Sequence, residues 1–292
     1  MQYIQLVIAV VLLAVVFGAN KGYQTICGTS PKKAIGFNCL LGLFTFIIFL
    51  CVNGFRISFT PFSFLLSAMM NVILVSYSLI GFKLLESGTM ALYTVFLMSG
   101  GMILPYIYGV IYLKEPFGVL RFAALVLILL GVILSNGSNG KPSKKQLLMC
   151  IAVFILNGFV SIISKIHQIE TVHSTVTASE YVMLGGIFKF VFCGILFFSV
   201  KDKPEKKKTS DKKNIVLKAV SLIALAAVCD GVSYLLQLYG ASNLPATVLY
   251  PFITGGGIVF STILGAVVFG EKLTKRTVLS VAFCFCGTLM FL

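Results

Sequence analysis

The stretch YGVIYLKEPFGVLRFAALVLILLGVIL, residues 108–134, shows the pattern that recurs along the whole chain. An apolar run ends near residue 112, a short break carries Lys114 and Glu115, and a second apolar run begins near residue 117. An apolar run of about 20 residues can cross about 30 Å of hydrocarbon as a helix. The stretch therefore predicts two consecutive membrane spans that are antiparallel neighbours, because the loop between them is so short.

The composition also indicates a protein that is embedded in lipid. Hydrophobic residues make up 58% of the 292 residues, charged residues make up 11%, and the mean hydropathy is +1.02. A soluble domain typically has about 25% charged residues. Helices are predicted in preference to a barrel, whose strands would alternate over about ten residues. The predicted spans lie near residues 3–20, 34–53, 62–82, 89–112, 117–135, 147–167, 175–200, 215–238, 245–269 and 274–292.

An internal repeat divides these spans into two groups of five. Glu115 and Glu271 are 156 residues apart, and each lies between two consecutive spans. A smaller offset of 144 residues pairs Lys21 with Lys165 at the ends of the first and sixth spans, so the second half carries an insertion. The 156-residue offset also pairs Gly100, Gly101, Gly109 and Gly131 with Gly256, Gly257, Gly265 and Gly287.

Two halves of five spans insert into a membrane with opposite orientations, because an odd number of crossings ends on the other side. The sequence therefore predicts an all-α membrane protein with ten transmembrane helices arranged as two inverted five-helix repeats. We place the first repeat at residues 1–137 and the second at residues 138–292. Many secondary transporters have this inverted-repeat architecture.

Residues 108–134 and residues 264–292 (LGAVVFGEKLTKRTVLSVAFCFCGTLMFL) resemble the closing signature of ten-helix, EamA-type members of the drug/metabolite transporter superfamily. In that signature a Glu follows the fourth span of each repeat and a Gly lies within the fifth. Gly270 and Glu271 fit the signature, whereas Lys114 stands where the first copy would have a Gly. The resemblance covers essentially the whole chain. It implies export or uptake of small metabolites by alternating access to a central cavity, and similar proteins handle amino acids, lipophilic cations, sugars or nucleotide conjugates.

The formal net charge of +14 comes mainly from the breaks between spans, with the densest run at Lys201–Lys213 (KDKPEKKKTSDKK). Basic loops between apolar spans are the usual product of membrane insertion, so we expect no nucleic-acid partner. The odd-numbered breaks carry 18 of the 23 Lys and Arg residues. The positive-inside rule then places those breaks in the cytoplasm and both termini outside, the reverse of the arrangement typical of similar proteins.

Asp230 lies near the middle of the predicted span 215–238, and Ser233, Tyr234 and Gln237 follow it at helical spacing on one face. An ionisable group in hydrocarbon is costly and is therefore a candidate for function. We expect Asp230, Tyr234 and Gln237 to line a wet cavity, where Asp230 binds substrate or exchanges protons. The alternative is that Asp230 has a structural partner such as a lysine.

Lys21 and Lys165 occupy corresponding places in the two halves and could face a common cavity, where two cations would favour a carboxylate or phosphate. The alternative is that both ammonium groups extend to the lipid headgroups. Four tyrosines fall in spans that border the central cavity in similar proteins, and they suit an amphipathic ligand because each has an apolar face and a hydroxyl. They are Tyr77, Tyr93, Tyr234 and Tyr250.

Glu115 and Glu271 lie at span ends next to Lys114 and Lys272, where a salt bridge or a carboxylate at a helix start is the ordinary explanation. We predict structural or gating roles for them. The glycine runs that contain Gly101 and Gly257 are expected to allow close helix approach and bending during gating.

We predict no enzymatic activity, no cofactor and no metal site. The chain has only two histidines, His167 and His173, and it lacks the HExxH and GxSxG motifs of membrane hydrolases. A metal site that combines these histidines with Glu170 is the minor alternative.

The sequence thus predicts a multi-pass protein of the cell membrane that acts as a secondary transporter of a small polar or amphipathic metabolite, amino-acid-like or another organic solute. We expect alternating access, export, membrane lipids as surroundings, protons as the coupling ion, and a monomer. The alternative is a non-transporting assembly factor or lipid-binding scaffold with the same fold.

Overall fold

The computed structural model describes residues 2–86, 90–135, 143–200, 212–270 and 272–291. Within these ranges the regular secondary structure is α-helical, without a β-strand, and ten α-helices are joined by loops and turns. They are α1 (Gln2–Cys27), α2 (Pro31–Val52), α3 (Pro61–Glu86), α4 (Met90–Ile111), α5 (Val119–Ser135), α6 (Lys144–Ile169), α7 (Ala178–Ser199), α8 (Lys212–Asn243), α9 (Ala246–Phe269) and α10 (Lys275–Leu289).

Eight of these helices are long and apolar enough to cross a membrane, and the chain is therefore a multi-pass membrane protein. The two others are shorter, α5 with 17 residues and α10 with 15. The predicted first span, 3–20, ends too early, because α1 continues to Cys27 and contains Lys21. Likewise α8 extends beyond the predicted range 215–238 at both ends. An apolar run marks only the part of a helix in hydrocarbon, whereas backbone hydrogen bonding continues into the polar interface.

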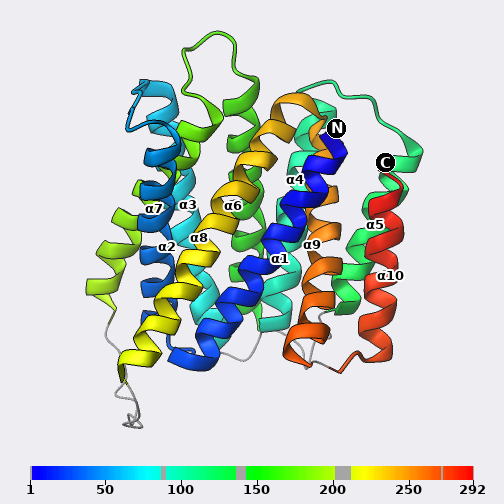
Figure 1. Ribbon diagram of the computed structural model, residues 1–292. Helices are drawn as coiled ribbons and strands as arrows, with labels where there is room; N and C mark the ends of the chain where they lie inside the picture. The colour runs from blue at the N-terminus through cyan, green and yellow to red at the C-terminus, as the bar shows by residue number, and fades with distance from the viewer. Residues whose placement is uncertain (1, 87–89, 136–142, 201–211, 271, 292) are drawn as a thin grey trace.

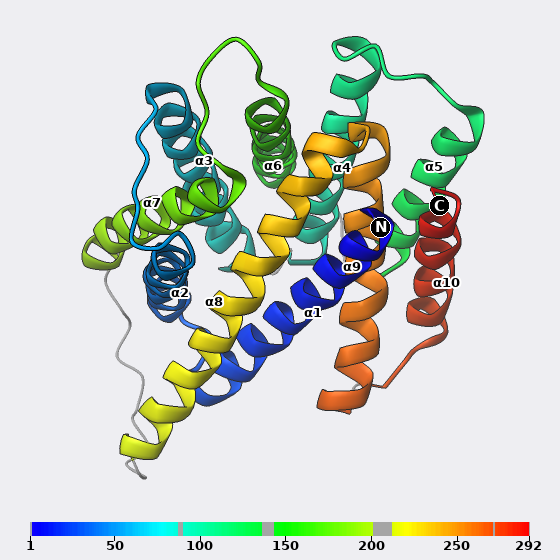
Figure 2. The same cartoon turned by 45° about the horizontal axis from the view of Figure 1, so that its top comes forward.

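The helices stand side by side in a bundle with a helix pair at each edge (Figure 1). The α2–α7 pair forms one edge and the α5–α10 pair forms the other, and both views place the remaining six helices between them (Figure 2). Both termini, the α8–α9 turn and the α6–α7 loop lie at the same end of the bundle, called the α8–α9 face below.

The packing of the first five helices is matched by the packing of the last five. The contact of α1 with α8 corresponds to that of α6 with α3, and the contact of α1 with α9 corresponds to that of α6 with α4. If each of the first five helices is exchanged with the helix five places later in the chain, the pairs α2–α7, α4–α9 and α5–α10 remain the same. α1 descends from the α8–α9 face whereas α6 ascends toward it (Figure 1).

The backbone around the two signature stretches is also alike. Lys114 has a φ of 55° and Gly270, 156 residues later, has a φ of 63°, so both adopt the left-handed conformation. Gly adopts this conformation without a steric penalty, whereas Lys must be held there by its surroundings. Lys114 therefore takes the backbone shape of the Gly that the signature contains, although the residue differs.

Local signals explain where several helices begin. Ser and Thr side chains accept hydrogen bonds from backbone N–H groups of the first turn, which otherwise lack partners. At the starts of α6 and α7 the cap is reciprocal, with Gln146 and Glu180 bonding back to the backbone of the cap residue. The capping residues are Ser30 for α2, Ser143 for α6, Thr177 for α7 and Thr274 for α10.

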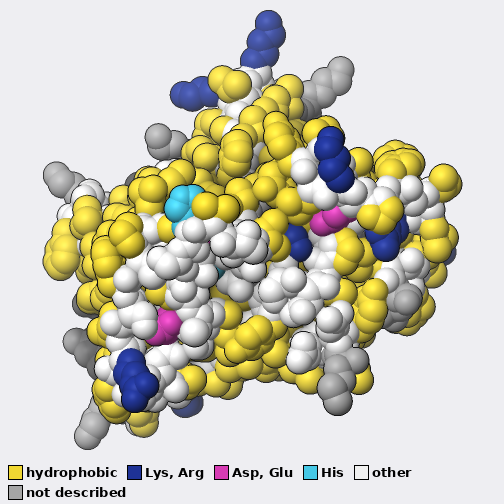
Figure 3. All heavy atoms as spheres, turned by 90° about the horizontal axis from the view of Figure 1, so that it is seen from above, with side chains coloured by type: hydrophobic (Ala, Val, Ile, Leu, Met, Phe, Trp, Pro, Cys, Tyr) yellow, Lys and Arg dark blue, Asp and Glu magenta, His cyan; other side chains and the backbone are white. Residues whose placement is uncertain are grey.

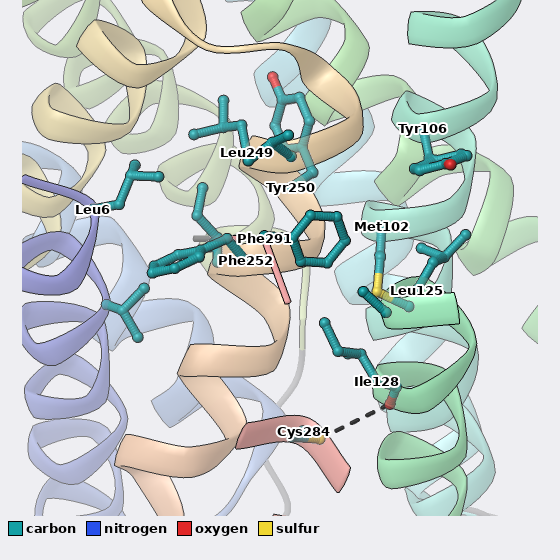
Figure 4. Close-up of a cluster of buried hydrophobic side chains, with 14 of the residues drawn as sticks. Leu6, Met102, Tyr106, Leu125, Ile128, Leu249, Tyr250, Phe252, Cys284 and Phe291 are labelled. Atoms are coloured by element: carbon teal, nitrogen blue, oxygen red, sulfur yellow. Dashed lines mark hydrogen bonds between the residues drawn. The ribbon is translucent and has the colours of Figure 1, made fainter. Parts of the chain in front are cut away.

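Hydrophobic side chains cover the outside of the bundle as well as its interior. Phe198, Val119 and Val267 are among the most exposed, which is the normal situation for a surface that faces lipid. Inside, one buried cluster joins α1, α4, α5, α9 and α10 (Figure 4). There Ile128 of α5 lies beside Cys284 of α10, and the two helices of the edge pair are in direct contact.

At the opposite edge, α2 and α7 approach so closely that backbone meets backbone. A Cβ atom added at Gly42 would lie 2.7 Å from the backbone nitrogen of Phe190 and 2.8 Å from the carbonyl oxygen of Gly186. At Gly186 the added atom would lie 2.7 Å from the backbone nitrogen of Phe46. Small residues at such crossings allow the van der Waals contact that holds helices together in lipid.

We predict that Gly42→Ala and Gly186→Ala each destabilise the protein by about 1–3 kcal/mol, because the helix backbones must move apart to admit the methyl group. The measurement is the temperature at which the detergent-purified protein loses its monodisperse elution peak. Gly194→Ala on α7 is the matched control, since its nearest neighbour would be the Cys39 sulfur at 3.9 Å. Equal melting temperatures for all three variants would contradict the prediction.

Candidate functional site

A cavity of about 510 Å³ lies between the two groups of helices. Eight helices contribute to its wall, namely α1 to α4 and α6 to α9, whereas no described residue of α5 or α10 lines it. Most of the wall is apolar, as at Leu13, Phe17 and Leu97. Its polar and charged residues are Thr45, Asn71, Tyr77, Thr94, Asn157, Ser161, Ser164, Lys189, Asp230, Tyr234, Gln237, Tyr250 and Thr254.

One ion pair crosses the wall of this cavity. Lys189 of α7 donates to the carboxylate of Asp230 of α8, with 3.2 Å between Nζ and Oδ2. The side chains are 26% and 27% exposed, so both charges remain accessible from the cavity. Among the described residues these are the two charged groups of the wall. The structure places Asp230 in the cavity wall, as the sequence predicted, and also pairs it with a lysine, the partner that the sequence offered as the alternative to a functional role.

The stripe predicted on α8 divides between two environments. Tyr234 and Gln237 line the cavity together with Asp230. Ser233 is buried against α1, where its hydroxyl donates to the carbonyl oxygen of Ala9 at 2.7 Å. Gln237 in turn donates to the Ser233 hydroxyl at 3.1 Å. The cavity-lining side of α8 is therefore shifted from the predicted one, because it excludes Ser233 and includes Gly231 and Leu238.

Two tyrosine hydroxyls connect helices around the cavity. Tyr234 lies 2.9 Å from the hydroxyl of Ser164 on α6, and Tyr250 of α9 donates to the carbonyl oxygen of Ser161 at 2.6 Å. Tyr77 also lines the cavity. Tyr93 is absent from the described wall and packs instead in a small cluster with Tyr77 and against Gly81. Buried tyrosines commonly satisfy their hydroxyl in this way.

The two glycines that were singled out both line the cavity, in different surroundings. A Cβ atom at Gly101 would lie 2.6 Å from the amide nitrogen of Asn157, so this position is tightly filled. At Gly257 the nearest atom would be the Leu13 side chain at 3.9 Å, which leaves ordinary contact distance. Gly101 therefore serves close packing of α4 against α6, whereas space alone does not require a glycine at position 257.

Lys165 and Lys21 lie outside the described wall of the cavity. The ammonium group of Lys165 is buried and donates to the carbonyl oxygens of Ala241 and Leu244 at 2.6 Å and 2.7 Å. Lys21 lies over the ring of Phe269 at the end of α9, with 4.7 Å between Nζ and the ring centroid. The structure thus does not bring the two lysines together at one ligand position.

Glu115 caps the start of α9 from another part of the chain. Its Oε1 and Oε2 atoms accept hydrogen bonds from the backbone amides of Ala246 and Thr247 at 2.6 Å and 2.9 Å. Glu271 lies outside the described residues. The two histidines are separately engaged, His167 with Ser63 at 2.8 Å and His173 stacked on the ring of Phe62. The described residues contain no group of His, Cys, Asp and Glu that could hold a metal ion.

Sequence reasoning missed several polar residues of the wall. Asn71 and Asn157 lie within α3 and α6, and the amide of Asn157 donates to the carbonyl oxygen of Leu97 at 2.7 Å. An asparagine inside an apolar span is a usable signal, because its amide must find a partner away from lipid. Lys189 gives the same signal, because it lies near the middle of the predicted span 175–200.

The fold and the cavity define a helical multi-pass membrane protein with a polar site between its two groups of helices. The EamA-like transporter family matches residues 144–292, just over half of the chain. The chain belongs to the EamA-like transporter family, and thus to the membrane transporters of the drug/metabolite transporter superfamily.

Two further comparisons concern individual proteins. No curated protein sequence matches the chain significantly. A protein of known crystal structure superposes on it with a TM-score of 0.76 at 14% sequence identity, over 99% of this chain and 95% of its own. At that identity the likeness establishes a shared fold across nearly the whole of both chains.

We predict that the Lys189–Asp230 pair is energetically coupled. Lys189→Met or Asp230→Asn alone leaves one charge without its partner in the cavity wall and lowers stability, whereas the double variant removes both charges. We expect a coupling energy of about 1 kcal/mol, moderated by the partial exposure of both side chains. Melting temperatures of the four proteins in one detergent measure it.

Lys218→Met provides the control for this cycle. Lys218 also lies on α8 but is exposed and distant in sequence from Asp230. Its effect should add to that of Asp230→Asn without coupling. Additive effects of Lys189→Met and Asp230→Asn would show that the ion pair contributes no stability.

Proposed function

We propose that the protein is a secondary transporter that carries a small polar or amphipathic metabolite across the cell membrane by alternating access, with export as its direction. The observation that carries this proposal is the cavity between the two groups of helices, which combines an accessible ion pair with a mainly apolar wall. Family membership supports the class of activity, and the size of the cavity falls within the range of small-molecule sites.

We further propose ten spans arranged as two inverted repeats. The matched packing of the two groups of helices, the opposite directions of α1 and α6, and the equivalent left-handed residues Lys114 and Gly270 support this arrangement. The short helices α5 and α10 pair with each other, and a span of 15–17 residues can be accommodated by local thinning of the bilayer. A cavity at the interface of such repeats can open to either side by rocking of one half.

The charges of the cavity favour a zwitterionic ligand of the amino-acid type. One cation and one anion leave the wall without net charge, so a ligand of net charge would bring an uncompensated charge into a low-dielectric site. A zwitterion can place its carboxylate on Lys189 and its ammonium group on Asp230, which exchanges one ion pair for two. The apolar wall, with Leu13, Phe17 and Leu97, then accommodates a hydrophobic side chain.

Proton coupling would act through the same pair. Protonation of Asp230 removes the anion that Lys189 faces and weakens the binding of a ligand ammonium group. A proton and a substrate would therefore compete for one carboxylate, which is a direct way to couple their movements. The sequence contains no P-loop motif, so the energy has to come from solute or proton gradients.

The proposal predicts selective stabilisation by zwitterions. A ligand at 100 times its Kd raises the stability of the folded protein by about 2.7 kcal/mol. We expect amphipathic amino acids to raise the melting temperature of the purified protein more than their decarboxylated amines or deaminated acids do. Asp230→Asn and Lys189→Met should each abolish the preference for the zwitterion, because each removes one of its two charge partners.

The loop variant Glu170→Gln serves as the control and should keep the preference. Uptake of the stabilising solute into proteoliposomes, with and without a pH gradient, then measures transport and coupling. Binding without transport would favour a scaffold that kept the fold, and a response to organic anions alone would contradict the zwitterion assignment.

A further inference from the structure

The backbone amides at the start of α9 find their hydrogen-bond acceptor in a residue from the other half of the chain. Helix α9 begins after Pro245, whose side chain provides no cap, so its first amides need another acceptor. Glu115, in the loop between α4 and α5, supplies both carboxylate oxygens to the amides of Ala246 and Thr247. An anion at a helix start is also favoured by the helix dipole.

The end of α8 is held by a positive charge, opposite in sign to that of Glu115. Lys165 of α6 donates to the carbonyl oxygens of Ala241 and Leu244, which lie in the last turn of α8 and in the turn that follows. Its side chain is only 5% exposed, so these carbonyls replace water around the buried ammonium group. A cation at this position also satisfies carbonyl groups that lack a helical partner.

The loop that carries Glu115 is shaped to present its carboxylate. The left-handed residue Lys114 precedes it, and the backbone amide of Glu115 bonds to the carbonyl oxygen of Gly109 at 3.0 Å. A Cβ atom at Gly109 would lie 2.6 Å from Oε2 of Glu115. The carboxylate therefore occupies space that any larger residue at position 109 would take.

The α8–α9 turn lies at one end of the cavity. Ala241 at the end of α8 and Tyr250 near the start of α9 both line the cavity wall. Figure 1 places this turn at the end of the bundle that also carries the termini, and Figure 3 shows that end with polar groups and backbone across its middle and hydrophobic side chains around them. Lys165 and Glu115, which carry opposite charges, thus hydrogen-bond to the two ends of this turn beside the cavity.

We propose that Lys165 and Glu115 form an electrostatic latch that holds the α8–α9 turn across this end of the cavity, and that release of this latch opens the cavity at the α8–α9 face. The inference rests on the proposed transport function and names the residues that control access to the cavity from the α8–α9 face. Lys165 and Glu115 are positioning residues, because they act on the turn and have no contact with the cavity.

The first experiment measures hydrogen exchange of the α8–α9 turn in lipid nanodiscs. We expect the amides of Leu244 and of residues 246–249 to exchange about tenfold faster in Glu115→Gln and Lys165→Met, since local opening no longer breaks charge-assisted hydrogen bonds. Lys165→Arg, which keeps the charge and the donors, should stay close to the parent protein. Unchanged exchange in Glu115→Gln and Lys165→Met would overturn the latch.

Glu170→Gln is the matched control for this measurement. The amides of Val172 and His173 donate to this loop carboxylate and lower the pKa of Glu170. It therefore also caps backbone amides, and the α6–α7 loop lies at the same face. Its replacement should speed exchange only within residues 171–173 and leave the α8–α9 turn unchanged.

The second experiment separates a gate from a purely structural clamp. Thr254→Cys places a thiol in the cavity wall, where no described residue is a cysteine. Labelling by the impermeant cation trimethylammonium-ethyl methanethiosulfonate, in intact cells and in inside-out vesicles, reports which side reaches the cavity. Mass spectrometry of the peptide that contains residue 254 keeps the native cysteines out of the measurement.

We expect Lys165→Met and Glu115→Gln to raise labelling from the α8–α9 face about tenfold, as the turn opens more often. If the turn exchanges faster in these variants but residue 254 is still labelled from the same side, the gating role is wrong. Lys165 and Glu115 then only stabilise the turn. A thiol that no variant exposes to either side would instead overturn the proposed transport function, and the latch with it.

Discussion

The structure depends on one constraint, which is that backbone amides and carbonyls at helix ends must find partners where water is scarce. Ser30, Ser143, Thr177 and Thr274 meet this need locally. At the α8–α9 turn the need is met by charged side chains from α6 and from the loop after α4. Because those partners are distant in the sequence, satisfying the backbone at this turn also joins the two halves of the protein.

The same scarcity of water gives the cavity its chemical character. An isolated charge in a mainly apolar wall would be costly, and Lys189 and Asp230 pair with each other. Both side chains are also partly exposed to the cavity. Lys165 obeys the same rule with backbone carbonyls as its partners, and it is therefore committed to holding a helix end. The Lys189–Asp230 pair and Lys165 thus have different roles, and each role is set by the groups that these charges face.

The two groups of helices share their packing pattern although their residues differ considerably. Lys114 shows how this works, because it adopts the left-handed backbone of its counterpart Gly270 and so keeps Glu115 in place. The two groups are alike in helix packing, in the left-handed backbone at Lys114 and Gly270 and in a few charged and small residues of the sequence, whereas the surfaces that face lipid need only be hydrophobic. This explains how a protein with 14% sequence identity can share the fold along nearly its whole length.

The sequence by itself determined the helical membrane class, the approximate positions of the helices and the presence of a charge, Asp230, inside a span, because hydrophobic runs and charge positions are properties of the chain alone. Only the tertiary structure decided that Lys189 is the partner of Asp230, that Asn71 and Asn157 line the cavity, and that Tyr93, Lys21 and Lys165 do not. It also decided that Glu115 caps α9. Such contacts join residues from different helices, and the rotation of each helix about its axis is set by packing against its neighbours.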